Sequence, residues 1–392
     1  MSSHKKFPSI PLLKRGRGVR VFVGLSGGVD SSVAAALLVR QGYDVTGVFM
    51  KNWSEPHLDS HKGSCWIDER RDAMRVAAKL KIPFLTMDFE KEYKSQVVDY
   101  MFREYEAGRT PNPDIMCNKL IKFPLFWREA KKLGADFIAT GHYARIRKSE
   151  IRSTKSETNS KFQIPNSKFK LLKGVDEKKD QSYFLYAINQ EDLSHTLFPV
   201  GDLTKPDVRK IAAKLNLPTA KKEESMGICF VGEVKIKDFL QKKIKSVPGK
   251  IVNTDGKVIG KHDGIWYYTI GQRSGLGVGG GEPYFVVGKD IKKNVLIVAR
   301  GASHPSLYNK EAELRDVHWI SGIQPKLPFK ATIRLRHQHP GGRAVIKEVP
   351  PLGEVAPPKV KIIFDRPERA VTPGQSAVFY KGDECLGGGV VK

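Results

Sequence analysis

The segment 19–50 constrains the fold more than any other part of the chain, because two apolar runs flank a helical pattern. VRVFVGL and DVTGVFM have the character of buried strands, and SSVAAALLVRQG between them reads as a helix with Gly42 just past its end. A strand, a helix and a strand in succession form a parallel pair with a right-handed crossover. The alternation continues to ADFIATGHYA at 135–144, read as a further strand, so we expect an α/β domain on a parallel sheet.

The chain changes character twice after this pattern. The polar, basic stretch 147–170 contains NSKF twice and indicates a surface insertion or a long hairpin. After about residue 230 the helical pattern gives way to short alternating strands, with an Asp-Gly hairpin turn in GKIVNTDGKVIG. We therefore predict a basic tail at 1–19, a catalytic α/β domain at 20–222, a small β-rich middle domain at 223–302 and a C-terminal β-barrel at 303–392.

The charge balance narrows the class of partner. The 392 residues contain 67 Lys and Arg against 42 Asp and Glu, a formal net charge of +25, which indicates either a polyanionic partner or simply a lysine-rich surface. No apolar run is long enough to cross a bilayer, and the basic N-terminus resembles a tail or an organelle transit peptide rather than a secretory signal. We expect a cytoplasmic monomer that binds no membrane.

The loop GLSGGVDSS, between the first strand and the first helix, has the composition of an anion site. The free N–H groups and the dipole of a helix N-terminus attract phosphate. Gly27 and Gly28 let the backbone approach phosphate oxygens closely, and Ser26, Ser31 and Ser32 add hydroxyl donors. The loop is neither a Walker P-loop nor a dinucleotide fingerprint. A glycine-rich turn without a ligand is the alternative.

The four cysteines form no CxxC pair, so we predict neither a zinc site nor any other metal site built from the protein. Cys117, in TPNPDIMCNKLIKF, comes just before a helix predicted from residue 118, and a helix N-terminus favours the nucleophilic thiolate. Cys229, in MGICFVGE, resembles a buried strand cysteine when read alone. The same plain reading, a small buried apolar side chain, is open for Cys117.

A series of motifs carries a resemblance to a known family. In chain order they are GLSGGVDSS, FMKNW, TPNPDIMCNKLIKF, ATGHYARI, KDQSYFL, MGICFVGE, TIGQRSGLGVGG and PGQ. The first resembles the PP-loop of the ATP-pyrophosphatase superfamily, and the ordered set resembles the tRNA-specific 2-thiouridylases from about residue 20 onward. One departure is IRLRHQ, where the family has an Arg-Tyr-Arg pattern and this chain has Leu335 in place of the tyrosine, so a stacking contact is not expected.

The resemblance implies an ATP-dependent tRNA-uridine 2-sulfurtransferase that acts on the wobble uridine, U34. ATP with Mg²⁺ would adenylate the C2 oxygen and release pyrophosphate, and AMP would leave as sulfur enters. Cys229 would carry a persulfide received from a sulfur-relay protein or a cysteine desulfurase. Cys117 would be the nucleophile that assists transfer and forms a transient disulfide with Cys229, with Asp114 as acid–base or base-positioning group. The uridine would have to leave its stack.

The resemblance also implies two binding surfaces. The residues of the ATP site would be Gly24, Leu25, Ser26, Gly27, Gly28, Val29, Asp30, Ser31, Met50 and Gly141. The residues that contact tRNA or the target base would be Asn112, Pro113, Asp114, His142, Lys179, Asp180, Gln181, Arg334, Arg336, His337 and Gln375. Without the resemblance, Met50 reads as core, His142 as a satisfied loop histidine, 179–181 as a solvated loop and the two arginines as a solvated strand face.

Two other functions stay open at this point. A different PP-loop enzyme could adenylate a small molecule, as an amidotransferase-type synthetase does, and would need neither paired cysteines nor a basic barrel. A non-enzymatic RNA-binding protein could also be built on a decayed nucleotide-binding fold, although the intact phosphate loop argues against it.

Overall fold

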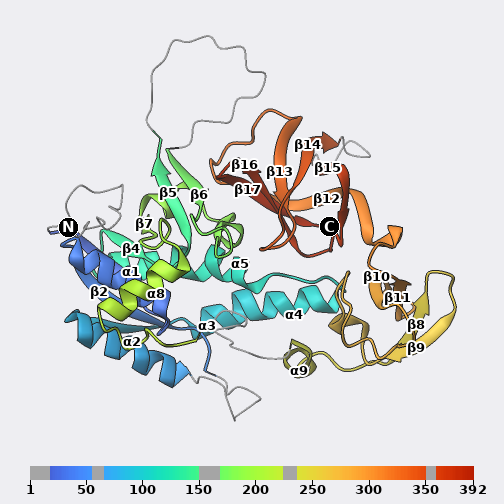
Figure 1. The fold of residues 1–392 in the computed structure, drawn as a ribbon, viewed down its shortest axis with the longest axis horizontal. Coiled ribbons are helices and arrows are strands. Elements are labelled where there is room, and N and C mark those ends of the chain that lie inside the picture. The colour runs from blue at the N-terminus through green and yellow to red at the C-terminus, as the bar shows by residue number, and fades with distance from the viewer. Residues whose placement is uncertain (1–17, 55–65, 150–167, 224–235, 350–358) are drawn as a thin grey trace, which may run out of the picture.

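A five-stranded parallel sheet with the strand order β3-β2-β1-β4-β7 forms the N-terminal part of the molecule (Figure 1). The computed structural model describes residues 18–54, 66–149, 168–223, 236–349 and 359–392. The strands are β1 Arg20–Gly24, β2 Asp44–Lys51, β3 Phe84–Asp88, β4 Phe137–Ala139 and β7 Thr196–Leu197, and the helices beside them are α1 Val29–Arg40, α2 Trp66–Leu80 and α8 Lys205–Lys214. All pairings are parallel, which confirms the predicted sheet.

Two long helical segments follow β3, and each contains a π-helical turn. Their parts are α3 Glu90–Tyr93, η1 Lys94–Val98 and α4 Asp99–Glu106, then α5 Pro113–Cys117, η2 Asn118–Lys122 and α6 Pro124–Lys132. The second segment begins one turn before the predicted residue 118. Asn112 caps it by accepting a hydrogen bond from the Ile115 amide at 3.3 Å, and Pro113 occupies the first turn. Cys117 therefore lies inside the helix and not in front of it.

The single strand predicted over 135–144 is wrong, because the chain turns at 140–143 and enters a different sheet. β5 Ala144–Lys148 pairs antiparallel with β6 Phe169–Lys173, and β6 pairs in turn with β17 Glu384–Val391 of the barrel. The ends of the stretch 147–170 thus form a hairpin ladder, in which Lys148 lies opposite Phe169. Residues 150–167 lie outside the described part of the chain.

Two β structures follow the α/β part, as the sequence predicts. The middle sheet contains β8 Gly249–Asn253, β9 Val258–His262, β10 Tyr284–Asp290 and β11 Val295–Arg300. The expected Asp-Gly hairpin joins β8 and β9, with Gly256 at φ +83°. The barrel strands are β12 Tyr308–Trp319, β13 Phe329–Arg334, β14 Gly342–Val349, β15 Lys359–Arg369, β16 Ser376–Lys381 and β17. β12 pairs with both β15 and β17, which closes the barrel.

Five further short helices lie in the described part of the chain. They are η3 Ser182–Leu185, α7 Gln190–Ser194, α9 Ile236–Gln241, η4 Ile265–Tyr267 and η5 Pro305–Leu307. Within the described residues, no helix combines the length and the apolar character needed to cross a membrane. Figure 1 shows the barrel and the middle sheet at the end of the molecule opposite α1 and α2, with α4 running toward their junction.

A buried ion pair joins the α/β part to the barrel. The Asp180 side chain is 1% exposed and accepts a hydrogen bond from Arg334 Nη1 at 2.7 Å, and the Arg334 side chain is only 13% exposed. The amides of Gly174 and Ser182 and the Ser182 hydroxyl also donate to this carboxylate. A carboxylate so fully supplied with donors can remain charged in the interior.

Removing the charge of Asp180 should destabilise the protein, because Arg334 would then be buried without an anion. For Asp180→Asn we expect a loss of about 3 kcal/mol in the free energy of unfolding, measured by urea denaturation. The control is Asp383→Asn, which removes a carboxylate that is 67% exposed and pairs with Arg145 at 3.4 Å, and it should cost about 0.5 kcal/mol or less. Equal effects of the two variants would contradict this assignment.

Candidate nucleotide and thiol site

The loop between β1 and α1 is held in a curled form by its own hydroxyl groups. Ser31 Oγ accepts a hydrogen bond from the Ser26 amide at 3.2 Å and donates to the Gly28 carbonyl at 3.1 Å. Ser32 Oγ donates to the same carbonyl at 2.7 Å and accepts from Thr219 Oγ1 at 2.9 Å. Gly27 has φ +75°, the left-handed conformation that glycine adopts without strain. The loop therefore has a defined shape before any ligand binds.

Close packing at this loop explains why glycines occur beside it. A Cβ atom on Gly27 would collide with the Glu69 carbonyl oxygen, and one on Gly141 would lie 2.6 Å from the Ser31 amide nitrogen. A Cβ on Gly24 would lie 2.9 Å from the Met50 methyl carbon. Gly24, Met50 and Gly141 all follow or end parallel strands, so they meet at the carboxyl edge of the sheet, where ligands bind in open α/β folds.

Asp30 is held by residues from two other elements. Lys205 Nζ lies 2.8 Å from both Asp30 carboxylate oxygens, and the Tyr143 hydroxyl donates to Asp30 Oδ1 at 2.7 Å. The sequence analysis did not single out Lys205 or Tyr143. A signal was present for Lys205, because a lysine in the first turn of a helix opposes the helix dipole unless an anion pairs with it.

The predicted nucleophile lies in the helical segment next to this edge of the sheet. The Cys117 side chain is buried, and Asn118 Nδ2 donates to the Phe184 carbonyl of η3 at 3.0 Å. Further along the same segment, the Phe123 and His142 rings are 5.7 Å apart between centroids. The helical segment that contains Cys117 therefore meets the Gly141–His142 turn through Phe123, and Gly141 lies against Ser31 of the loop between β1 and α1.

His142 is enclosed in the interior. Its Nδ1 atom lies 2.7 Å from Thr140 Oγ1, and its ring also packs edge-on against Phe198. Burial and then the nearby Lys122 charge lower the pKa of His142 well below its usual value, so the ring is neutral at physiological pH. The predicted contact between this side chain and RNA stays a prediction, and the side chain is 9% exposed.

The remaining predicted RNA residues fall into two groups. Arg336 is exposed beyond the end of β13, and Lys179 is half-buried. In contrast, Asp180, Gln181, Arg334, His337 and Gln375 contact the protein itself. A solvated loop at 179–181 does not hold for Asp180, which is 1% exposed. Leu335, the departure from the family pattern, lies in the barrel core.

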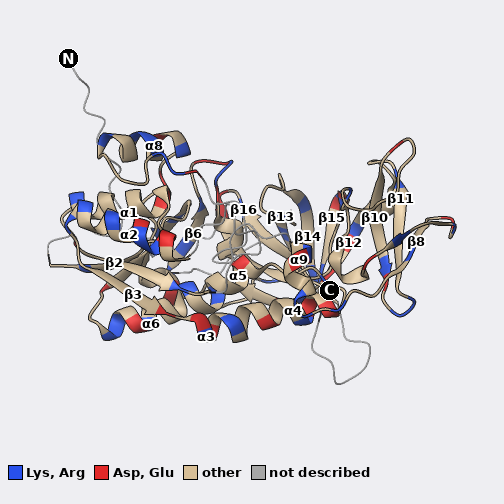
Figure 2. Ribbon diagram, turned by 90° about the horizontal axis from the view of Figure 1, so that it is seen from below, with Lys and Arg blue, Asp and Glu red and all other residues tan. Residues whose placement is uncertain are grey.

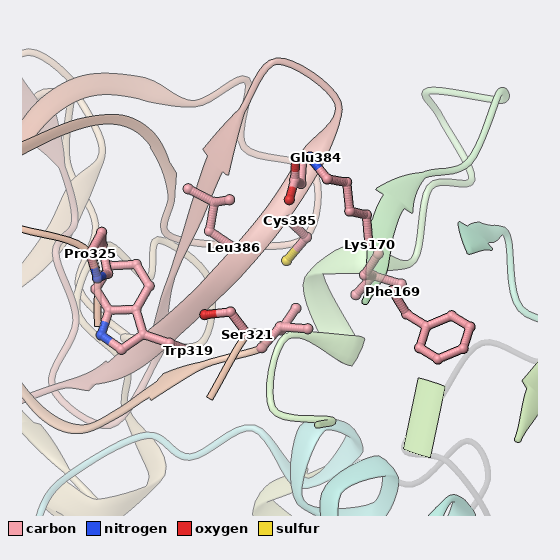
Figure 3. A pocket seen from close by; sticks show the side chains of 10 residues that line it. Phe169, Lys170, Trp319, Ser321, Pro325, Glu384, Cys385 and Leu386 are labelled. Carbon is pink, nitrogen blue, oxygen red and sulfur yellow. Dashed lines mark hydrogen bonds and ion pairs between the residues drawn. The ribbon is translucent and has the colours of Figure 1, made fainter. Parts of the chain in front are cut away.

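The other three cysteines are Cys65, Cys229 and Cys385. Cys229, the predicted persulfide carrier, and Cys65 lie outside the described residues. Cys385 is buried in β17, and burial raises the pKa of its thiol, which favours the unreactive neutral form. It lines a small pocket with Phe169, Lys170 and Trp319 between β6 and the barrel (Figure 3). Cys385 therefore has the character of a structural residue.

Two buried amides lack part of their hydrogen bonding within the described residues. Neither side-chain atom of Asn52 has a partner, and the same is true of Asn118 Oδ1. Asn52 comes directly after the last residue of β2, Lys51, and Asn118 follows Cys117. Since unpaired buried amide atoms are costly, both are candidates for contacts with a bound ligand. Both residues lie in motifs that carry the family resemblance, Asn52 in FMKNW and Asn118 in TPNPDIMCNKLIKF.

These features define an α/β protein on a parallel sheet, with a curled glycine loop at a helix N-terminus and two added β domains. Residues 19–233 match the family described as tRNA methyl transferase HUP domain, residues 237–300 the tRNA methyl transferase PRC-barrel domain, and residues 309–391 the aminomethyltransferase beta-barrel domain.

Relatives that match this chain along nearly its whole length identify the family more narrowly than the domain descriptions do. The tRNA-specific 2-thiouridylase MnmA of Geobacillus thermodenitrificans is 48% identical over 95% of this chain and 94% of its own length. The enzyme of the same name from Pseudoalteromonas translucida is 47% identical over 95% and 97%. The chain therefore belongs to the tRNA-specific 2-thiouridylase family.

Among solved structures, a 4-thiouridine synthetase–RNA complex with bound ATP is similar with a TM-score of 0.35 and 16% identity, over 57% of this chain and 50% of that chain. The NMN synthetase of Francisella tularensis gives a TM-score of 0.32 and 18% identity, over 58% and 79%. At such low TM-scores these likenesses do not bear on function.

Replacing Lys205 should weaken ATP binding, because the uncompensated Asp30 carboxylate would repel the phosphates. For Lys205→Gln we expect the Kd for ATP to rise about tenfold, or about 1.4 kcal/mol, by isothermal titration calorimetry. Lys210→Gln, on the exposed side of the same helix, should leave the Kd unchanged. An unchanged Kd for Lys205→Gln would show that the ion pair is irrelevant to the nucleotide.

Proposed function

We propose that this protein is an ATP-dependent enzyme that replaces the C2 oxygen of uridine 34 in tRNA with sulfur. The observation that carries the proposal is a chain of two contacts: Phe123, at the end of the helical turn that follows Cys117, packs against His142, and the neighbouring Gly141 lies against Ser31 of the loop between β1 and α1. This arrangement supports one site in which a nucleotide and a thiol act on the same base. The identity to named 2-thiouridylases along nearly the whole chain supports the same chemistry.

In the first step of the proposed reaction, the uridine C2 oxygen attacks the α-phosphorus of ATP. An O–P bond forms, the bond to pyrophosphate breaks, and C2 then carries AMP as a leaving group. The amide groups of residues 27–31 and the α1 dipole would hold the departing phosphates. Asp30, the carboxylate of the loop, is paired with Lys205 and Tyr143 and would shape the loop. Mg²⁺ is the ion expected to accompany ATP.

In the second step, sulfur enters and the two thiols are oxidised. The terminal sulfur of a Cys229 persulfide bonds to C2, and AMP leaves with the former C2 oxygen. Cys117 attacks the inner sulfur of Cys229, so the persulfide S–S bond breaks and a Cys117–Cys229 disulfide forms. The transferred sulfur gains the two electrons that the thiols lose, and an external dithiol reductant restores both cysteines. Asp114, in the first turn of α5, would hold the base or transfer a proton.

A basic surface suits the proposed substrate. Lys and Arg are spread over the N-terminal helices, the barrel and the middle sheet and do not gather at one place (Figure 2). With a formal net charge of +25, the protein can contact a long stretch of phosphate backbone.

Reconstitution tests the proposal directly. The protein is incubated with ATP, unmodified tRNA and a persulfide made by a cysteine desulfurase from cysteine, and the tRNA nucleosides are measured by mass spectrometry. We expect 2-thiouridine at position 34. Turnover of a small amine or acid without thiouridine would support a small-molecule synthetase instead. Binding of tRNA without ATP consumption would support a non-enzymatic RNA-binding protein.

Substitution of the two cysteines should block sulfur transfer without blocking the adenylation of the uridine. Cys117→Ser and Cys229→Ser should each lower thiolation by at least about a thousandfold, because no disulfide can close, while ATP-dependent pyrophosphate release with tRNA continues. Cys385→Ser and Cys65→Ser are the matched controls and should retain thiolation. Full activity of Cys229→Ser would rule out its role as the sulfur carrier.

Affinity for tRNA should fall steeply with salt, because each phosphate contact releases counterions. We expect the association constant to fall by at least tenfold between about 50 and about 200 mM KCl, measured by filter binding. A flat response would contradict the role given to the basic surface.

A further inference from the structure

The loop that leads into the cysteine helix is held by the barrel. The Thr110 amide donates to the Pro373 carbonyl at 2.9 Å, and Gln375 Nε2 donates to the Thr110 carbonyl at 2.8 Å. Gly374, between them, has φ +91°, and a Cβ atom there would lie 2.7 Å from the Thr110 nitrogen. The Pro-Gly-Gln turn is therefore shaped to fit the backbone of Thr110.

The middle sheet holds the same loop from another direction. Lys289 Nζ, on β10, donates to the Gly108 carbonyl at 3.1 Å, and Thr269 Oγ1 lies 3.2 Å from Thr110 Oγ1. Burial lowers the pKa of Lys289 to about 8. Burial of a lysine ammonium group costs free energy, and the hydrogen bond to the Gly108 carbonyl offsets part of this cost.

A charged cluster fixes the start of the loop at the end of α4. Glu104, whose side chain is 8% exposed, accepts two hydrogen bonds from Arg109, at 2.7 and 2.8 Å, and one from Arg315 of β12 at 2.6 Å. Burial by itself would raise the pKa of Glu104, but the two arginines hold it below its usual value. Both the loop and the barrel are thus tied to one buried carboxylate.

We propose that Gln375 and Lys289 are positioning residues, which hold the segment 108–111 so that Asn112, Asp114 and Cys117 stand correctly for sulfur transfer. This inference rests on the proposed function and gives Gln375 a role toward the protein backbone, in addition to the RNA contact that the resemblance implies. Pro111 and Pro113 leave the chain little freedom between the bound carbonyls and the first turn of α5. A displacement of the loop is therefore passed on to the helix, and small displacements of reacting groups are costly in rate.

The kinetic test compares Gln375→Ala with Gln324→Ala, an exposed barrel glutamine that bonds to Glu348. For Gln375→Ala we expect the single-turnover rate of thiolation to fall about tenfold or more, with the Kd for tRNA within about twofold of the wild-type value. Gln324→Ala should change neither quantity. A tenfold weaker Kd for tRNA with an unchanged rate at saturation would overturn the proposal and identify Gln375 as an RNA contact.

A second comparison uses the middle sheet. Lys289→Met should slow thiolation in the same way, and Lys289→Arg, which keeps a donor, should restore at least part of the rate. Lys292→Met, an exposed neighbour, is the control. Urea denaturation identifies any variant that fails to fold. If the Met and Arg variants were equally slow while both remained folded, the hydrogen bond to Gly108 would not be what matters.

Hydrogen exchange tests the positioning itself and does not depend on the reaction. Amides in a peptide spanning 107–117 should exchange at least about tenfold faster in Gln375→Ala and Lys289→Met than in the two controls, because the clamps on the backbone are lost. If exchange is faster in these variants but the wild-type protein does not thiolate tRNA, the proposal that Gln375 and Lys289 hold residues 108–111 stands and only the proposed function is refuted. Unchanged exchange would refute the proposal that these residues hold the loop.

Discussion

The docking of the barrel depends on the ion pair between Asp180 and Arg334, the most deeply buried charges among the contacts that fasten the barrel to the α/β part. Both side chains are largely buried, and their charges are tolerable only while each has the other and the carboxylate also has its amide and hydroxyl donors. An ion pair of this kind contributes little net stability compared with apolar packing, but it permits only one way of docking the two parts. The barrel is thereby kept where its 373–375 turn meets the loop before α5.

In the loop between β1 and α1, too, paired polar groups fix one arrangement of the chain. Hydroxyl groups within the loop fix its shape, and Lys205 neutralises the one carboxylate that would otherwise repel an anion. Both devices are built from the protein's own side chains, so the shape of the loop and its charge balance are set within the fold. The same residues that make the loop look polar and open in sequence thus make it rigid in the fold.

The predictions from sequence succeeded where the determining interactions are local. The parallel sheet, the glycine loop and the Asp-Gly hairpin follow from patterns within a few residues, and all three are present. The start of the second helical segment was misplaced because the helix was predicted to begin at residue 118, although Asn112 and Pro113 are a typical cap and first residue. Tyr143 and Lys205 were missed because they reach Asp30 from 113 and 175 residues away, which no periodicity reveals. Cys229 lies outside the described residues, so its part in the site stays a prediction.

The β5–β6 hairpin has a consequence for how the molecule is made. Its β6 strand pairs with β17, the last strand of the chain, although it emerges between β4 and β7 of the parallel sheet. During synthesis the backbone groups on that edge of β6 stay unpaired until β17, more than 200 residues later in the sequence, has been made. A nascent chain stalled before the barrel would therefore present an unpaired strand edge to which other chains could pair.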